Sequence, residues 1–142
     1  MRQFFFTLFI ACLLTASAFA GEPKAIADPD KFSEEILNGF AENRISDVAT
    51  RVADVVGIPE QKANVENSLK LLEGRTFEYR KKVIDKDYAG ALRQIVHYAY
   101  VKDVGFVYFR FNYKQTGSGW ILAHFNYTSE NNELFPPGLN ID

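Results

Sequence analysis

Three aromatic-rich runs between Leu92 and Ser129 constrain the fold of this chain more than any other feature. The runs cover residues 92–102, 106–114 and 120–128; each is rich in Tyr, Phe, Val and Ile, and glycine-containing turns separate them. Runs of this length and composition, joined by short turns, are typical of an antiparallel meander. We therefore expect these strands to form the bulky half of the fold, which the preceding segment covers.

The first twenty residues have the pattern of a secretory signal peptide. Arg2 precedes the apolar run 4–14, and Ala18-Phe19-Ala20 fits a small-residue cleavage site. A retained membrane anchor is the alternative, but a spanning helix needs about 20 apolar residues. We therefore expect residues 1–20 to be removed, the mature chain to begin at Gly21 without a stable membrane anchor, and the protein to be periplasmic or secreted.

The only cysteine, Cys12, lies within the expected signal peptide. The mature domain must then fold without a disulfide, which suits a bacterial periplasm better than an animal extracellular space. Two histidines, no mature cysteine and no HExxH motif argue against a metal site, and we expect no cofactor.

The mature chain is mildly acidic. Removal of Arg2 leaves 15 Lys and Arg against 18 Asp and Glu, a formal charge of −3 (15 − 18). This balance argues against nucleic acid as a main partner. The one basic run, Arg80-Lys81-Lys82, is interpreted as a solvated strand end, with a phosphate-binding patch as the alternative.

The segment 28–74 predicts three short amphipathic helices. Asp28-Pro29 is a good helix start, because Asp caps free N–H groups and Pro suits the first turn. Ser46 is the expected cap of the second helix, and Gly57 and Gly74 are the expected ends of the second and third. The three apolar stripes are Phe32, Ile36, Leu37 and Phe40; Val48, Val52, Val55 and Val56; and Val65, Leu69 and Leu72. Helices of this length do not persist alone, so they must share a surface.

The strand order and one hairpin register follow from the turns. The first strand is expected over residues 76–84, ahead of a turn at residues 88–90. Asp103-Val104-Gly105 predicts a three-residue hairpin loop with Gly in the left-handed position, which places Lys102 opposite Phe106.

The second hairpin has a less specific turn. Residues 115–119 predict its loop, which places Arg110 near His124. A slip of one residue would turn every side chain to the other face, so the register decides which residues meet the helices.

In this register the two faces of the sheet differ in character. One face is mostly apolar and is expected to lie against the helices: Ile95, His97, Ala99, Val101, Val107, Phe109, Phe111, Tyr113, Ile121, Ala123, Phe125 and Tyr127. The other is aromatic and amphipathic: Val96, Tyr98, Tyr100, Phe106, Tyr108, Arg110, Asn112, Trp120, Leu122, His124 and Asn126. A large exposed patch of the second kind usually marks a contact surface.

The expected order of three helices and a meander, together with the sequence of the last strand, resembles the nuclear transport factor 2-like family. That strand reads Gly119-Trp120-Ile121-Leu122-Ala123-His124-Phe125-Asn126-Tyr127-Thr128-Ser129. Many members end in a strand that reads roughly Trp-x-Ile/Leu-x-His-x-His/Asn-x-Ser, and Asn126 stands where a second His is common. The resemblance covers about residues 28–130. It implies a cystatin-like α+β cone with a pocket between helices and sheet, and dimerisation through the sheet.

The same resemblance bears on catalysis. Enzymes of the family that abstract a proton generally place an Asp or a His–Asp pair in the pocket. The three runs of the meander contain no Asp or Glu inside the strands. This departure weakens the transfer of a catalytic mechanism.

The expected fold is therefore α+β, with three N-terminal helices packed on a curved, cone-shaped, four-stranded antiparallel sheet. The domain should span residues 21–130, with residues 21–27 as a loose leader. Residues 131–142 are expected to form an irregular tail, in which Phe135 is a candidate plug for the open end of the cone.

Tyr98, Arg110 and His124 are expected to lie in one row across three strands, flanked by Tyr108 and Asn126. Because Arg presents a planar fork of donors that matches a carboxylate, the row could hold a small polar or anionic ligand. The interpretation we prefer is a homodimer interface in which Arg110 stacks on tyrosines and pairs with an acid of the other subunit.

His97 is expected on the helix-facing side beside Phe111, as a neutral, hydrogen-bonded core residue. If the pocket is open, His97 with Tyr113 or Tyr127 would be an acid–base candidate, because His titrates near neutrality. The sequence thus favours an exported binding domain without catalysis. The alternative is an isomerase-, dehydratase- or cyclase-like enzyme that uses His97 or His124.

Overall fold

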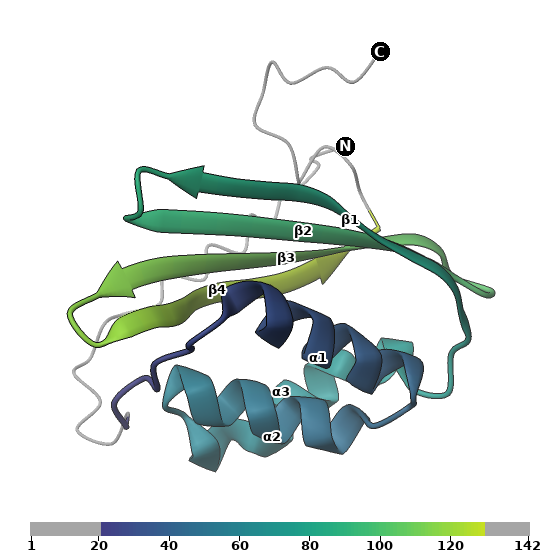
Figure 1. Ribbon diagram of the computed structural model, residues 1–142. Coiled ribbons are helices and arrows are strands. Elements are labelled where there is room, and N and C mark those ends of the chain that lie inside the picture. Colours follow the sequence, from purple (N-terminus) through teal and green to yellow (C-terminus); the bar gives the residue numbers. More distant parts are fainter. Residues whose placement is uncertain (1–20, 130–142) are drawn as a thin grey trace, which may run out of the picture.

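A computed structural model describes residues 21–129, in which helices precede a four-stranded antiparallel sheet (Figure 1). The predicted α+β class and its order, helices first and sheet second, are confirmed. The predicted signal peptide at 1–20 and the tail at 131–142 lie outside the described residues. Within residues 21–129, no helix is both long and apolar enough to cross a membrane.

Helix α1, Pro29–Ala41, begins as its sequence predicts. The Asp28 carboxylate accepts hydrogen bonds from the backbone N–H groups of Asp30 and Lys31, at 3.0 and 3.1 Å. Pro29 in the first turn loses nothing, since that N–H would have no partner in the helix. These contacts set where α1 starts and therefore which of its residues face the sheet.

Helix α2, Ile45–Val56, ends as predicted at Gly57, whose φ of 82° is a left-handed conformation that Gly adopts without strain. Its expected cap was wrong. The helix follows Arg44 without a side-chain cap, and the Ser46 hydroxyl donates instead to Glu66 at 3.3 Å.

The third predicted helix is confirmed, but it consists of a short α-helix with a 3-10 turn at each end. Helix α3, Lys62–Leu69, is flanked by the 3-10 turns η1, Pro59–Gln61, and η2, Lys70–Leu72. Leu69 and Leu72 are buried, as their spacing predicted.

The strands are β1 Phe77–Tyr88, β2 Leu92–Val101, β3 Gly105–Thr116 and β4 Gly119–Thr128, hydrogen-bonded in the order β1-β2-β3-β4. The sheet does not close, so β1 and β4 are its edges. Strand β1 runs four residues beyond the predicted end at residue 84.

The hairpin registers differ from prediction by two residues. Tyr100, and not Lys102, lies opposite Phe106. In the next hairpin Asn126, and not His124, lies opposite Arg110. Because side chains alternate with a period of two, this shift keeps each residue on its predicted face while changing its neighbours.

A bulge in β4 overturns part of the predicted face assignment. The pairing jumps from Asn112 with His124 to Tyr113 with Leu122, so Ala123 is the extra residue. As a result Trp120 and Leu122 turn toward the helices, and Leu122 is buried, whereas Ala123 is exposed.

The helices lie on one face of the sheet (Figure 1), and aromatic rings fill much of the space between them. The Phe40 ring from α1 lies 5.4 Å from Phe109, 6.4 Å from Phe77 and 6.4 Å from Phe125, measured between centroids. Phe111 lies 4.8 Å from Phe125 in the same layer. The centre of the fold is therefore packed by large side chains.

The leader at residues 21–27 is not loose, contrary to prediction. The Lys24 N–H donates to the Val55 carbonyl at 3.0 Å, and the Ile26 N–H donates to the Trp120 carbonyl at 2.6 Å. Ile26 is buried. The leader thus crosses from the end of α2 to the edge of β4 and joins the two layers.

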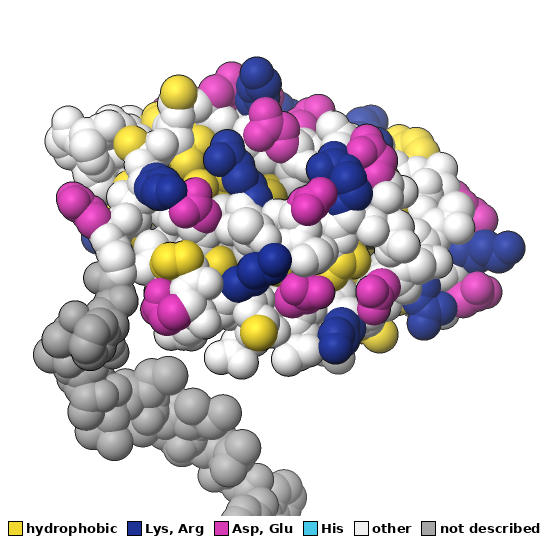
Figure 2. Space-filling model, turned by 90° about the horizontal axis from the view of Figure 1, so that it is seen from below, with side chains coloured by type: hydrophobic (Ala, Val, Ile, Leu, Met, Phe, Trp, Pro, Cys, Tyr) yellow, Lys and Arg dark blue, Asp and Glu magenta, His cyan; other side chains and the backbone are white. Residues whose placement is uncertain are grey.

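The helical side of the molecule is a solvated surface. Figure 2 shows this side, on which Lys and Arg side chains are interspersed with Asp and Glu and hydrophobic side chains are few. Such a mixed, patch-free surface does not suggest a contact site. The candidate sites therefore lie elsewhere.

Candidate functional site

The face of the sheet turned away from the helices, here called the outer face, carries a cluster of aromatic side chains. Ring centroids lie 5.5 Å apart for Tyr79 and Tyr98, 6.3 Å for Tyr98 and Tyr108, and 5.2 Å for Tyr100 and Phe106. Tyr79 is 48% exposed and Phe106 is 52% exposed. We call these five residues the outer aromatic cluster.

The predicted row of Tyr98, Arg110 and His124 does not form. Tyr98 lies opposite Tyr108, Arg110 lies between Val96 and Asn126, and His124 lies opposite Asn112. The two-residue shift of both hairpins separates the three residues while leaving them on the outer face.

The same shift creates a polar region beside the outer aromatic cluster. The Arg110 Nε donates to Asn126 Oδ1 at 3.1 Å, and the Gln94 Nε2 donates to Asn112 Oδ1 at 3.1 Å. Partial burial, and then the Arg110 guanidinium, lower the pKa of His124, so this ring is neutral at pH 7. The outer face thus has an aromatic half and a polar half, in which Arg110 is the charged group and Gln94, Asn112 and Asn126 are neutral.

The position predicted for His97 is confirmed. His97 is 3% exposed and lies edge-on to Phe111, with ring centroids 6.3 Å apart. Burial first, and then the charge of Lys82, lower the pKa of His97 to about 4. The ring is therefore neutral at physiological pH, as expected.

The hydrogen bond expected for His97 is absent. Its Nε2 atom is buried and has no hydrogen-bond partner among residues 21–129. Buried polar atoms in folded proteins are nearly always paired, so an unpaired one needs an explanation. The residues next to His97 in the sequence do not predict the unpaired Nε2 atom, because its surroundings depend on how α1 packs over β2.

A groove of about 450 Å³ lies beside His97, between α1 and the edge strand β1. We call it the α1–β1 groove. Its polar lining consists chiefly of Glu34, Asn38, Glu78, Arg80, Lys82 and His97. The predicted basic run is solvated at Arg80 and Lys81, which are exposed, and it also contacts α1 through the bonds of Arg80 to Asn38 and of Lys82 to Asp30.

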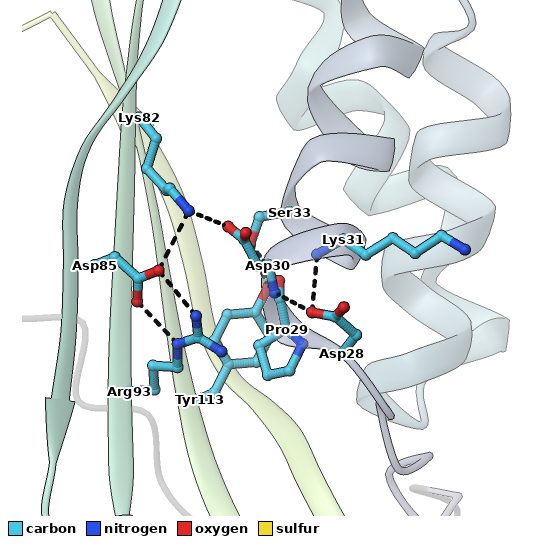
Figure 3. Close-up of polar contacts among 9 residues, drawn as sticks. All are labelled: Asp28, Pro29, Asp30, Lys31, Ser33, Lys82, Asp85, Arg93 and Tyr113. Carbon is cyan, nitrogen blue, oxygen red and sulfur yellow. Dashed lines mark hydrogen bonds and ion pairs between the residues drawn. The ribbon is translucent and has the colours of Figure 1, made fainter.

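One end of the groove is fixed by a charged network (Figure 3). Arg93 donates to both carboxylate oxygens of Asp85, at 2.9 and 2.8 Å, and Lys82 lies 2.7 Å from Asp30 and 3.3 Å from Asp85. The hydrogen bonds from Arg93 lower the pKa of Asp85, and the hydrogen bond to Asp30 raises the pKa of Lys82. The network links α1 to β1 and β2.

Tyr113 and Tyr127 are both engaged in structural contacts. The Tyr113 hydroxyl lies 2.6 Å from Ser33 Oγ and donates to the Pro29 carbonyl at 3.0 Å (Figure 3). The Tyr127 hydroxyl donates to the Ser68 carbonyl at 2.6 Å. Burial raises the pKa of both tyrosines. They hold helices to the sheet and are poor partners for His97 in proton transfer.

The described residues show no arrangement that would activate a catalytic group. His97 has no carboxylate in hydrogen-bond contact, and residues 21–129 hold no group of three or more His, Cys, Asp or Glu side chains suited to a metal ion. Among the described residues, two surfaces are the candidates for binding that we consider: the outer face and the α1–β1 groove.

Comparison of the chain with protein-family models finds no match, and comparison with curated proteins finds none either.

Proposed function

We propose that this protein is an exported binding domain without catalytic activity, which works as a homodimer assembled through the outer face of its sheet. The single observation that carries the proposal is the outer aromatic cluster, in which Tyr79, Tyr100 and Phe106 are substantially exposed. Exposed aromatic patches of this kind, rimmed by polar groups, are typical of protein contact surfaces.

The composition of the outer face suits an interface. Tyr and Arg are enriched among the interface residues that contribute most of the binding energy. Tyr98, Tyr108 and Arg110 supply both residue types on the outer face. His124 and Asn126 lie toward the polar region, where they can hydrogen-bond across a two-fold axis. Because a two-fold interface joins identical patches, uncharged groups that both donate and accept are well suited to it.

The size of the outer face is compatible with a small dimer interface. Four strands about 4.8 Å apart and about ten residues long, at about 3.3 Å per residue, outline roughly 600 Å². Projecting side chains add to that outline, and a standard interface buries about 800 Å² per partner. A second copy would therefore need most of the face, including both its aromatic and its polar half.

Association through the strand edges is less favourable than association through the face. Strand β1 carries four basic residues and two register shifts, and charges and bulges both oppose edge-to-edge pairing. At the other edge, the Ile26 N–H already pairs with Trp120 of β4. The second copy is thus expected to stack on the face, as the family resemblance also implies.

The alternative function, an isomerase-, dehydratase- or cyclase-like enzyme using His97 or His124, has weaker support. Such an enzyme needs an open pocket with a histidine oriented by a carboxylate. Here Phe40 and its ring neighbours fill the centre of the fold, and His97 has no carboxylate partner among the described residues.

Sedimentation velocity over a range of protein concentrations tests the homodimer. Phe106→Glu places a charge in the exposed half of the outer aromatic cluster, and we expect it to shift the protein to monomer. Leu71→Glu is the matched control, because Leu71 is a similarly exposed apolar residue, at 58%, in η2 on the helical side. The control should sediment as the wild-type dimer.

Two results would contradict the proposal: a wild-type protein that stays monomeric at about 100 μM, which corresponds to an association free energy weaker than about −5.5 kcal/mol, or a Phe106→Glu variant that remains fully dimeric. Circular dichroism of the variants separates a lost interface from a lost fold.

A further inference from the structure

The floor of the α1–β1 groove gathers three nitrogen-bearing side chains from the inward positions of two neighbouring strands. Arg80 and Lys82 are two residues apart on β1 and therefore point to the same side. Lys82 lies opposite His97 on β2, and Arg80 lies opposite Ala99.

Arg80 and Lys82 retain donor capacity, and His97 Nε2 is a third donor in the tautomer that carries the proton on this atom. The Arg80 Nη1 donates to Asn38 Oδ1 at 2.8 Å, which uses one of several guanidinium N–H groups. Lys82 bonds two carboxylates, those of Asp30 and Asp85, and an ammonium has one more hydrogen than that. The buried Nε2 of His97 has no partner at all among the described residues.

Donors without acceptors define the chemistry of the missing partner. A ligand that completes this floor must bring acceptor oxygens, and a carboxylate matches an Arg fork together with one further N–H. Glu34 and Glu78 also line the groove, and their negative charges disfavour an anion of higher charge more than a monocarboxylate. The volume of about 450 Å³ lies within the range of small-molecule sites.

We propose that the α1–β1 groove binds a small monocarboxylate, whose oxygens accept hydrogen bonds from Arg80 and from His97 Nε2. Lys82 adds positive charge beside the carboxylate without giving up its contacts to Asp30 and Asp85. The site lies on the helical side of β1 and β2, whereas the homodimer uses the outer face, so this inference does not depend on the dimer.

The two histidines of the chain make the test direct. We would record imidazole ¹H–¹⁵N spectra of the full mature protein, in which His97 reports on the groove and His124, on the outer face, serves as an internal control. Sodium acetate is the probe, and sodium chloride at equal ionic strength corrects for salt.

We expect acetate to shift the His97 resonances saturably, with a dissociation constant on the order of 1 mM, because a probe with so few atoms binds weakly. His124 should not respond. Bound acetate should also raise the pKa of His97, since an adjacent negative charge favours the imidazolium.

Arg80→Gln removes the fork and should weaken acetate binding at least about tenfold, a loss expected for a charged hydrogen bond. Lys86→Gln is the matched control, because Lys86 is a basic residue of the same strand whose ammonium lies over the Tyr88 ring instead of the groove. This control should bind acetate as the wild type does, and amide spectra establish that both variants fold.

The proposal is overturned if acetate moves the His97 and His124 signals alike, or if the His97 response does not saturate. It is also overturned if Arg80→Gln and Lys86→Gln bind equally well. Inorganic phosphate is the selectivity probe, and binding as tight as that of acetate would reject a monocarboxylate site.

Discussion

His97 is the residue whose environment departs furthest from that of a free side chain, and its charge state should make stability depend on pH. Its folded pKa is about 4, against an ordinary value of 6.5. Between these values the unfolded chain binds a proton that the folded chain excludes. Folding stability should therefore be full above about pH 6.5 and fall as the pH drops toward 4, by up to about 3 kcal/mol.

Urea unfolding between about pH 4 and pH 7 measures this effect, and His97→Phe should remove it. Phe keeps a ring against Phe111 but has no group to protonate. His124→Gln is the control and should keep most of the wild-type pH dependence, because His124 is exposed whereas His97 is buried. Parallel pH profiles for the wild type and His97→Phe would refute the assignment.

At the same scale, the sequence predicts the face on which His97 lies but not its unpaired nitrogen or its place beside the groove. Alternation along β2 is enough to put His97 beside Phe111. The missing hydrogen bond, and the approach of Arg80 and Lys82, depend on how α1 sits over an edge strand. No local sequence signal reports that distance between separate elements.

At the scale of elements, the faces of β2 and β3 could be predicted, whereas the pairing of their residues could not. Apolar alternation identifies a face, but a shift of two residues leaves the alternation unchanged. The β2–β3 turn uses positive φ at both Asp103 and Gly105, so its Gly did not locate the loop uniquely. The bulge at Ala123 has no signature of its own, and it reversed Trp120 and Leu122.

The crossing of α1 and α2 depends on the absence of a side chain at Gly39. A Cβ atom at this position would collide with Cγ2 of the buried Val48 on α2. We expect Gly39→Ala to destabilise the protein by about 1–3 kcal/mol through overpacking. That loss should outweigh the gain in helix propensity, which is about 1 kcal/mol.

Chemical denaturation of Gly39→Ala, Val48→Ala and the double variant measures this close contact. The double variant should lose less stability than the two single variants together, because removing Cγ2 relieves the collision. Gly117→Ala is the control, since a Cβ there meets no atom within 4 Å. Strict additivity would show that Gly39 serves another purpose.

At the scale of the whole molecule, helices and sheet are joined by the core and by the leader at residues 21–27, here called the strap, which the sequence predicts to be loose. The segment has no periodicity, and its single apolar anchor, Ile26, was too weak a signal to predict docking. In the structure Ile26 is buried against the core and pairs with Trp120. The segment therefore ties α2 to β4 on the helical side, and residues 21–27 do not cover the outer face.

Ile26→Ala should lower the free energy of unfolding by about 2 kcal/mol, the lower end for a buried Ile, because the site lies near the surface. Lys24→Ala is the control within the same strap. It removes only the ion pair with Asp54, whose partners are largely exposed, and exposed pairs contribute little. Both variants should retain the proposed dimer, because neither residue lies on the outer face. Urea unfolding measures the stability of the two variants, and sedimentation of the same samples measures their association. Equal stability of the two variants would mean that Ile26 does not anchor the strap. Loss of the dimer would mean that the proposed interface does not lie on the outer face.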